Sequence, residues 1–263
     1  MSEEPEKKPE EKPEDKEKLA EGTLISHLLE LRNRLIRALA AVLIAFIPCA
    51  MKANWLFNLV AQPILHKLPP NAHLIATGVM SPFMVPFKLS MYVALFIAMP
   101  YVLYQVWSFV APGLYRHEKR FAIPLLASSI VLFYCGMAFA FKVVFPVVFQ
   151  FSARTTPLGV EWMADINNYI GFVMHMFLAF GVAFEAPVAV VLLVITGLVS
   201  IEKLKHNRGY VLIVVFLVAG AVTPPDAISM LTMAGPMYLL YEVGLFFAAM
   251  CLKMRSKQAA KGE

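Results

Sequence analysis

Residues 169–199 read YIGFVMHMFLAFGVAFEAPVAVVLLVITGLV, an apolar run in which Glu185 is the single charged residue. A helix that crosses the hydrocarbon core of a bilayer needs about 20 apolar residues at about 1.5 Å each, so this run is long enough to span a membrane. A carboxylate near the middle of such a span costs roughly 2.5 to 3.5 kcal/mol on insertion scales. Glu185 is therefore predicted to be protonated, paired inside the protein, or used by a partner.

The rest of the chain repeats this apolar pattern. Hydrophobic residues make up 59% of the 263 residues, a composition typical of membrane proteins rather than of soluble domains. The other uncharged runs are residues 35–51, 89–110, 121–141, 210–222 and 227–241. The last two are shorter than the length that usually spans a bilayer. We predict an all-α polytopic membrane protein with six transmembrane helices, of which the last two are short.

Lysine and arginine residues indicate the orientation, because cytoplasmic segments of membrane proteins carry an excess of them. With the N-terminus inside, 18 of the 23 basic residues fall in inner segments, namely the tail to residue 37, the loops 115–120 and 201–208, and the end from residue 253. An odd number of spans would place the C-terminal basic cluster outside. Six spans with both termini cytoplasmic is the consistent topology. The net charge of +5 then reflects topology rather than a nucleic-acid partner.

The chain divides into three segments. Residues 1–22 consist almost entirely of Glu, Lys, Pro and Asp, and we expect them to form a disordered cytoplasmic tail. Residues 23–252 form the six-helix membrane domain, and residues 253–263 form a cytoplasmic C-terminal tail.

No motif indicates an enzyme. The sequence contains no P-loop, no dinucleotide fingerprint and no nucleophile elbow. Cys49, Cys135 and Cys251 lie in separate spans without the spacing of metal ligands. The pair His117-Glu118 lacks the second histidine of a metalloprotease motif, since Phe121 stands in its place. We expect no catalytic residue, no metal and no cofactor.

Two acidic residues stand among basic ones at predicted inner edges of the membrane. Glu30 belongs to an amphipathic stretch that leads into the first span, and either a functional role or a solvated face fits it. Glu118 lies in the second inner loop, where it either acts in function or balances the charge of Arg116 or Arg120.

The surroundings of Glu185 favour contact with another helix. Pro187 removes one backbone donor and predicts a kink. Gly181 lies one turn earlier on the same face, where it would allow another helix to approach closely. His175 is about 15 Å away along the helix axis, so it cannot contact Glu185 directly. A glutamate that is hydrogen-bonded within its own bundle remains the structural alternative.

Two further residues mark the outer side. Pro63 is predicted to break or kink a surface helix that begins near residue 54. Asp226 joins the last two spans, and from the residues alone it is best interpreted as a helix N-cap.

Five motifs, taken in order, resemble the TatC family, the receptor core of the twin-arginine protein translocase. They are HLLELR from His27, SPFMVPFKL from Ser81, YQVWSFVAPGLYRHEKR from Tyr104, FGVAFEAP from Phe180 and TPPD from Thr223. The resemblance covers roughly residues 23–252.

This resemblance implies that Glu30 and Glu118 bind the paired arginines of a signal peptide at the cytoplasmic surface, with Arg32 and Phe109 in support. A guanidinium group binds a carboxylate through two parallel hydrogen bonds, which a lysine cannot do. Two such acids can therefore select an Arg-Arg pair over a Lys-Lys pair.

The resemblance also implies that Pro63, Glu185 and Asp226 serve assembly or transport, with Glu185 meeting polar groups of the single-span partners TatA and TatB. Met230 stands where the family has a glutamine, so a polar partner contact is not expected there. The implied function is export of folded proteins across the bacterial cytoplasmic (inner) membrane with the proton motive force. A homo-oligomer within a larger complex, in contact with membrane lipid, is also implied.

Two other functions fit the residues. A proton-coupled small-solute transporter would use Glu185 as its proton carrier, and an assembly scaffold would have no substrate site.

Overall fold

The computed structural model of the chain describes residues 13–65, 73–110, 119–155, 163–222 and 227–259. Its α-helices are α1 Pro13–Met51, α2 Ala53–Leu65, α3 Ser81–Val110, α5 Lys119–Phe139, α6 Phe145–Thr155, α7 Ile166–Ala183, α8 Ala186–Ile195, α9 Ile201–His206, α10 Arg208–Val222 and α11 Ala227–Ala259. A π-helical turn, η1 Ala140–Val144, joins α5 to α6. The strands β1 His73–Ile75 and β2 Met163–Asp165 pair in parallel.

Six apolar helical stretches confirm the predicted polytopic all-α fold. Five are long enough to cross a membrane, and they are Ile25–Met51, Ser81–Phe109, Ile123–Phe151, Ile166–Ile195 and Met230–Met254. The remaining stretch, Arg208–Ala221 in α10, is short as predicted.

The last span is longer than predicted. Its apolar stretch contains 25 residues, whereas we predicted a short span. Arg208 forms a salt bridge of 2.7 Å with Glu242 Oε2, and the hydroxyl of Tyr238 donates to Oε1 at 3.0 Å. Because these contacts satisfy the carboxylate, α11 continues through it.

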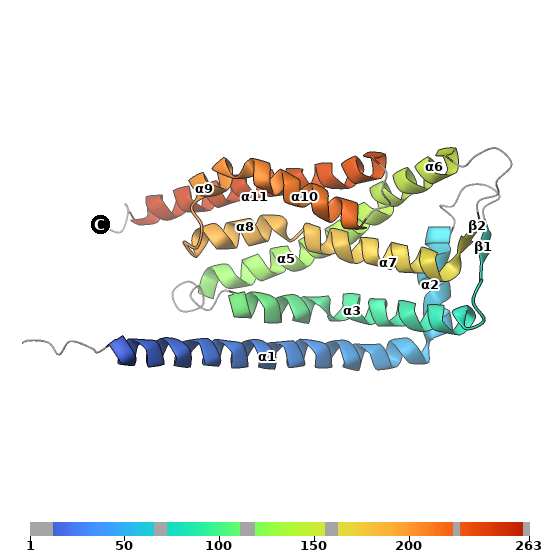
Figure 1. Cartoon of the computed structure of the whole chain (residues 1–263), viewed down its shortest axis with the longest axis horizontal. Helices are drawn as coiled ribbons and strands as arrows, with labels where there is room; N and C mark the ends of the chain where they lie inside the picture. The colour runs from blue at the N-terminus through green and yellow to red at the C-terminus, as the bar shows by residue number, and fades with distance from the viewer. Residues whose placement is uncertain (1–12, 66–72, 111–118, 156–162, 223–226, 260–263) are drawn as a thin grey trace, which may run out of the picture.

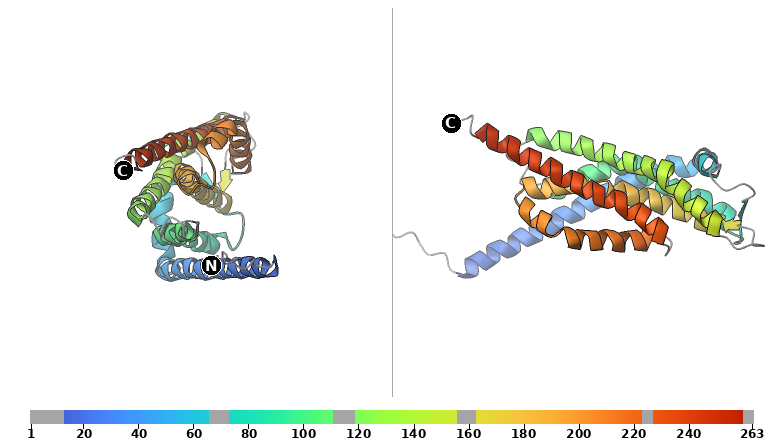
Figure 2. Two further views of the ribbon diagram at one scale, coloured as in Figure 1. Left: turned by 90° about the vertical axis from the view of Figure 1, so that its left-hand side faces the viewer. Right: turned by 90° about the horizontal axis from the view of Figure 1, so that it is seen from above.

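The helices lie in layers that run along the length of the bundle (Figure 1). Helix α1 packs along α3 on one side, α5, α7 and α8 form the middle, and α10 and α11 cover the other side, as the left view in Figure 2 also shows. Helix α1 begins and α11 ends at the same end of the bundle, opposite β1, β2 and α2. This arrangement fits an even number of spans.

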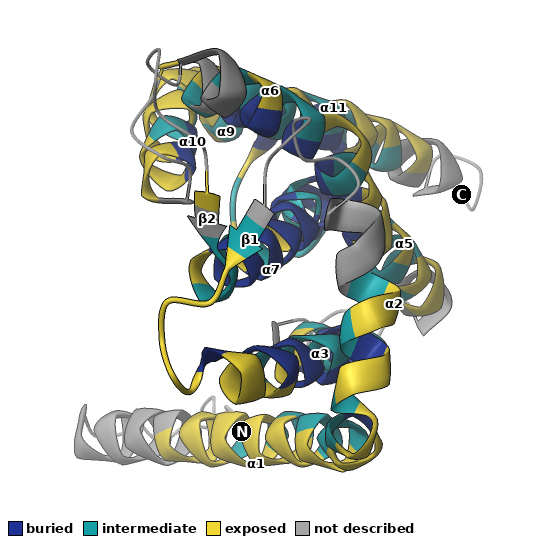
Figure 3. Cartoon of the chain, turned by 90° about the vertical axis from the view of Figure 1, so that its right-hand side faces the viewer, coloured by how far each residue is buried: buried dark blue, intermediate teal, exposed yellow. Residues whose placement is uncertain are grey.

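The centre of the bundle is helix α7. Its side chains Ile170, Val173, Met174, Met176 and Phe180 have no exposed surface. Helix α1 lies at the rim, and only 6% of its apolar window is buried, against 56% for the span formed by α7 and α8 (Figure 3). Apolar side chains on such an outer face suit hydrocarbon rather than water, which agrees with a multi-pass membrane protein.

Three helix ends differ from the sequence predictions. Helix α1 begins at Pro13, inside the predicted disordered tail, and α11 runs to Ala259, inside the predicted C-terminal tail. Glu, Lys and Ala favour helix, which accounts for helical structure in these polar segments. Helix α2 continues through Pro63, which was predicted to break or kink it, and ends at Leu65. Pro63 lies in the last turn, so its missing N–H removes a single backbone hydrogen bond close to the helix end. Residues 1–12 and 260–263 lie outside the described part of the chain.

Asp165 anchors the strand pair at the start of α7. Its Oδ2 accepts hydrogen bonds from the hydroxyl of Thr77 at 2.6 Å and from the Thr77 backbone N–H at 3.1 Å. Its Oδ1 accepts from the backbone N–H groups of Asn167 and Asn168, so Asp165 also caps the helix. The Thr77 hydroxyl, followed by the Thr77 and Asn168 N–H groups, lowers the pKa of Asp165 from 3.8 to about 2.

This depressed pKa gives the anchor a pH window. Stability from these hydrogen bonds is full above pH 3.8 and is lost as the pH falls through about 2. Thr77→Val removes the hydroxyl donor, so the pKa of Asp165 should move back toward 3.8, and the acid loss of stability should become smaller and be complete at a higher pH. Thermal unfolding of the purified protein between pH 2 and 5 measures this shift.

A matched control is Thr196→Val, because the Thr196 hydroxyl bonds carbonyl groups of its own helix. Identical acid profiles for Thr77→Val and the unaltered protein would contradict the prediction.

Candidate functional site

Glu185 lies at a break in the central span. Helix α7 ends at Ala183 and α8 begins at Ala186, because Pro187 offers no N–H to the Ala183 carbonyl. The N–H of Glu185 instead donates to the Val182 carbonyl at 3.0 Å, three residues back. The kink predicted at the proline is therefore confirmed, and it places the carboxyl group where the helix changes from one segment to the next.

The carboxyl group of Glu185 is paired inside the bundle. The indole N–H of Trp107, on α3, donates to Ser129 Oγ at 2.7 Å, and the Ser129 hydroxyl on α5 donates to Glu185 Oε2. Glu185 is 8% exposed and Ser129 has no exposed surface. Pairing within the protein was one of the three outcomes predicted for this residue, whereas Trp107 and Ser129 were not identified from the sequence.

One carboxyl oxygen of Glu185 keeps unused hydrogen-bonding capacity. Oε1 is buried and has no hydrogen-bond partner among the described residues. Leaving a buried polar atom unpaired costs about 1–3 kcal/mol, and more for a charged group. A further hydrogen bond at this atom would therefore be favourable.

Glycines bring the neighbouring helices close to the break. A Cβ atom added to Gly136 of α5 would lie 2.8 Å from the carbonyl carbon of Phe180, and one added to Gly244 of α11 would lie 2.8 Å from Pro187 Cα. Gly136 lies two helical turns from Ser129 and shares its face of α5. The close approach at Gly136 thus brings the Ser129 hydroxyl within reach of Glu185.

Gly181 packs within the bundle rather than against a partner helix. A Cβ there would lie 2.5 Å from Cε2 of Phe133, on α5. A helix therefore approaches Gly181 closely, as expected, and it is α5 of the same bundle.

His175 belongs to a separate hydrogen-bonded pair. Its Nδ1 lies 2.6 Å from the Gly171 carbonyl, which can only accept, so Nδ1 carries the hydrogen. Its Nε2 lies 3.1 Å from the Tyr92 hydroxyl, so both ring nitrogens are used. His175 faces a groove of about 650 Å³ between α7, α10 and α11 that is otherwise lined by apolar side chains. This pairing agrees with the predicted absence of contact with Glu185.

A second polar cluster lies where α1 packs on the far end of α3. The rings of His27 and Phe109 stack with centroids 4.3 Å apart and planes inclined by 18°. Glu30 follows His27 by three residues, which places the two on one face of α1. Oε1 of Glu30 accepts hydrogen bonds from Arg34 Nε at 2.9 Å and Nη2 at 2.5 Å. Phe109 and Glu30 are thus brought to the same edge of the bundle.

The pairing of Arg34 with Glu30 was not predicted from the sequence. The four-residue spacing of the two residues was the available signal, since such pairs meet on a helix surface. Arg32 is exposed and lies on a different face of α1 from Glu30.

The remaining candidates are not brought into either cluster. Pro63 lies in α2, at the opposite end of the bundle from Phe109 (Figure 1). Glu118 and Asp226 lie outside the described residues. Within the described part of the chain, no group of three or more His, Cys, Asp or Glu residues could hold a metal ion.

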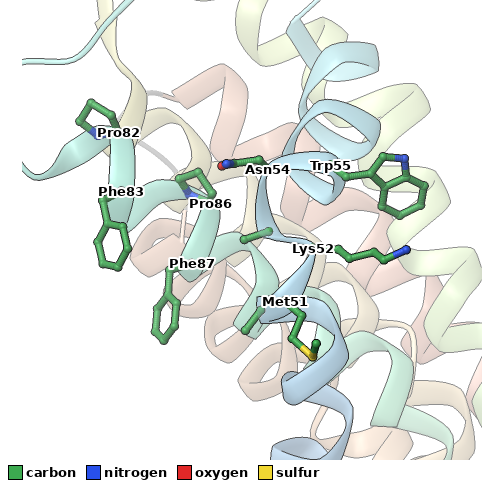
Figure 4. Close-up of a pocket in the computed structure, with 10 residues that line it drawn as sticks. Met51, Lys52, Asn54, Trp55, Pro82, Phe83, Pro86 and Phe87 are labelled. Atoms are coloured by element: carbon green, nitrogen blue, oxygen red, sulfur yellow. The ribbon is translucent and has the colours of Figure 1, made fainter.

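A hollow of about 740 Å³ lies where α1 ends, α2 begins and α3 begins. Its charged lining residue is Lys52. Figure 4 shows Lys52 and Trp55 pointing to one side while Phe83 and Phe87 point to the other. Since these side chains do not converge, the hollow is not a candidate site.

Comparison with known proteins gives consistent matches. The family model "Sec-independent protein translocase protein (TatC)" matches residues 26–236. A TatC protein of Azotobacter chroococcum is 52% identical over 90% of this chain and 92% of its own length, and that of Escherichia coli K12 is 50% identical over 86% and 87%. A crystal structure described as the twin arginine translocase receptor TatC superposes with a TM-score of 0.73 at 36% identity, covering 85% of this chain and 98% of its own.

Gly136→Ala tests the packing at the break. The added Cβ meets the backbone of Phe180 and lies 3.0 Å from Phe184 Cγ, so α5 must move away from α7. We expect a loss of about 1–3 kcal/mol of stability, seen as a lower Tm of the detergent-solubilised protein. The control is Gly235→Ala in α11, where nothing lies within 4 Å of the new atom. Equal Tm values for the two variants would refute the packing argument.

Proposed function

Since the chain belongs to the TatC family of Sec-independent protein translocase proteins, we propose that it is the subunit that binds twin-arginine signal peptides. It is a multi-pass membrane protein and a component of the twin-arginine translocase. Its named relatives are protein translocase subunits, so its function is transport, and we propose that it catalyses no reaction.

The observation that carries this proposal is the stack of His27 on Phe109, which sets the Glu30 turn of α1 beside the end of α3. We propose that Glu30 and Glu118 receive the two arginines of the signal peptide, with Phe109 and Arg32 in support. Glu118 follows closely after the end of α3 at Val110, which is compatible with a joint site.

The ion pair with Arg34 gives a physical basis for selecting arginine. Both hydrogen bonds from Arg34 end on Oε1 of Glu30, so Arg34 leaves Oε2 unused. An incoming guanidinium group can bind Oε2 of Glu30. It can also displace Arg34 and form two hydrogen bonds of the same kind. A lysine ammonium group cannot form these two parallel hydrogen bonds and acts as a point charge, so its binding free energy at Glu30 is less favourable.

Transport requires further parts. We propose that Glu185 docks the single-span partners TatA and TatB, and that Pro63 and Asp226 serve assembly. Folded cargo crosses the bacterial inner membrane at the expense of the proton motive force. Both termini of the chain face the cytoplasm, in agreement with the distribution of lysine and arginine. Several copies of the chain, with lipid, form the larger complex.

Signal-peptide recognition is tested by photocrosslinking Arg-Arg and Lys-Lys peptides to the purified chain. Glu30→Gln removes the charge while keeping the shape of the side chain. Loss of a charge-assisted hydrogen bond should lower Arg-Arg labelling about tenfold or more. The control is Glu202→Gln, an exposed acid in the short helix α9.

Equal labelling by the two peptides would refute the receptor role. Labelling that persists after Glu30→Ala is combined with Glu118→Ala would also refute it.

Glu185→Ala tests the division between recognition and docking. Because Glu185 lies at the helix break and Glu30 near the edge of α1, the variant should lose transport or partner assembly and keep signal-peptide binding. Transport into inverted membrane vesicles and peptide crosslinking measure the two separately. A variant that no longer binds the peptide would contradict this division.

A further inference from the structure

The hydrogen bonds that reach Glu185 run in one direction. The indole N–H of Trp107 can donate but not accept. Ser129 Oγ accepts this bond and has a single hydrogen, which it donates to Glu185 Oε2. Oε2 is therefore an acceptor whose position depends on two side chains from other helices. Oε1 is the atom that remains, buried and without a partner among the described residues.

The backbone on either side of Glu185 is held by close contacts. Gly136 packs on the carbonyl group of Phe180 before the break, and Gly244 packs on Pro187 after it. With the backbone fixed, the direction of the carboxyl group depends on its side-chain torsions. The hydrogen bond from Ser129 is the contact that fixes those torsions.

We infer that Trp107 and Ser129 are positioning residues that fix the direction of the Glu185 carboxyl group, on which docking of a partner helix depends. The inference rests on the proposed docking role of Glu185 and adds the residues that orient its carboxyl group.

The test compares three variants of the full chain in membranes that contain the single-span partners. Ser129→Ala removes the donor, Trp107→Phe removes only the indole N–H and part of the ring, and Ser129→Thr retains the hydroxyl. The matched control is Ser128→Ala, because the Ser128 hydroxyl bonds the Leu125 carbonyl of its own helix at 2.7 Å. Tm values establish that each variant is folded.

The first readout is the infrared carboxyl band of Glu185, identified by its absence from Glu185→Gln. We expect the band to shift in Ser129→Ala and in Trp107→Phe, and to return toward its original position in Ser129→Thr. The second readout is crosslinking of the exposed neighbouring residue Val182 to the partner helices, with Glu185 left in place. It should fall about tenfold in Ser129→Ala, the factor for one lost hydrogen bond to a charged group, with signal-peptide binding unchanged.

A band that does not shift in folded Ser129→Ala would overturn the inference. A shifted band with unchanged crosslinking would overturn it as well, because orientation of the carboxyl group would then not govern docking. Failure of the proposed function is distinguishable, since Glu185→Ala would then leave partner assembly and transport intact. Ser128→Ala should change neither readout, and an effect there equal to that of Ser129→Ala would attribute the result to general damage of α5.

Discussion

A carboxyl group in the apolar interior must be hydrogen-bonded, and the middle of this bundle is arranged around that requirement. The break before Pro187 places Glu185 between two helical segments. Gly136 then lets α5 approach until the Ser129 hydroxyl reaches the carboxyl group, and Trp107 on α3 completes the chain of donors. Side chains from three helical segments thus meet at one polar group.

Helix α3 takes part in both polar clusters through a single turn. Phe109 stacks on His27 of α1. Trp107, two residues earlier, lies on a different face of α3 and donates a hydrogen bond to Ser129 of α5. The edge at which α1 meets α3 and the break in the central span are therefore joined by a continuous set of contacts. A change in the packing of α3 against α1 would therefore alter the geometry of both clusters.

Local properties of the sequence were enough to predict the spans and the kink. Apolar runs determine which helices cross a membrane, and the missing N–H of Pro187 determines where a helix breaks. Ser129 and Trp107 carried no such signal, because they meet Glu185 only through packing between distant segments. Arg208 likewise lies far from Glu242 in sequence, so the ion pair within the last span was not predicted. The helix that approaches Gly181 was not identified for the same reason, since Phe133 comes from a distant segment.

The contact of Gly244 with Pro187 has a consequence for the order in which the protein is made. Synthesis proceeds from the N-terminus, so α8 enters the membrane before α11, the last helix, exists. Until α11 is inserted, one side of the Glu185 break lacks the neighbour that covers Pro187. The central span therefore completes its packing only after α11 has entered the membrane.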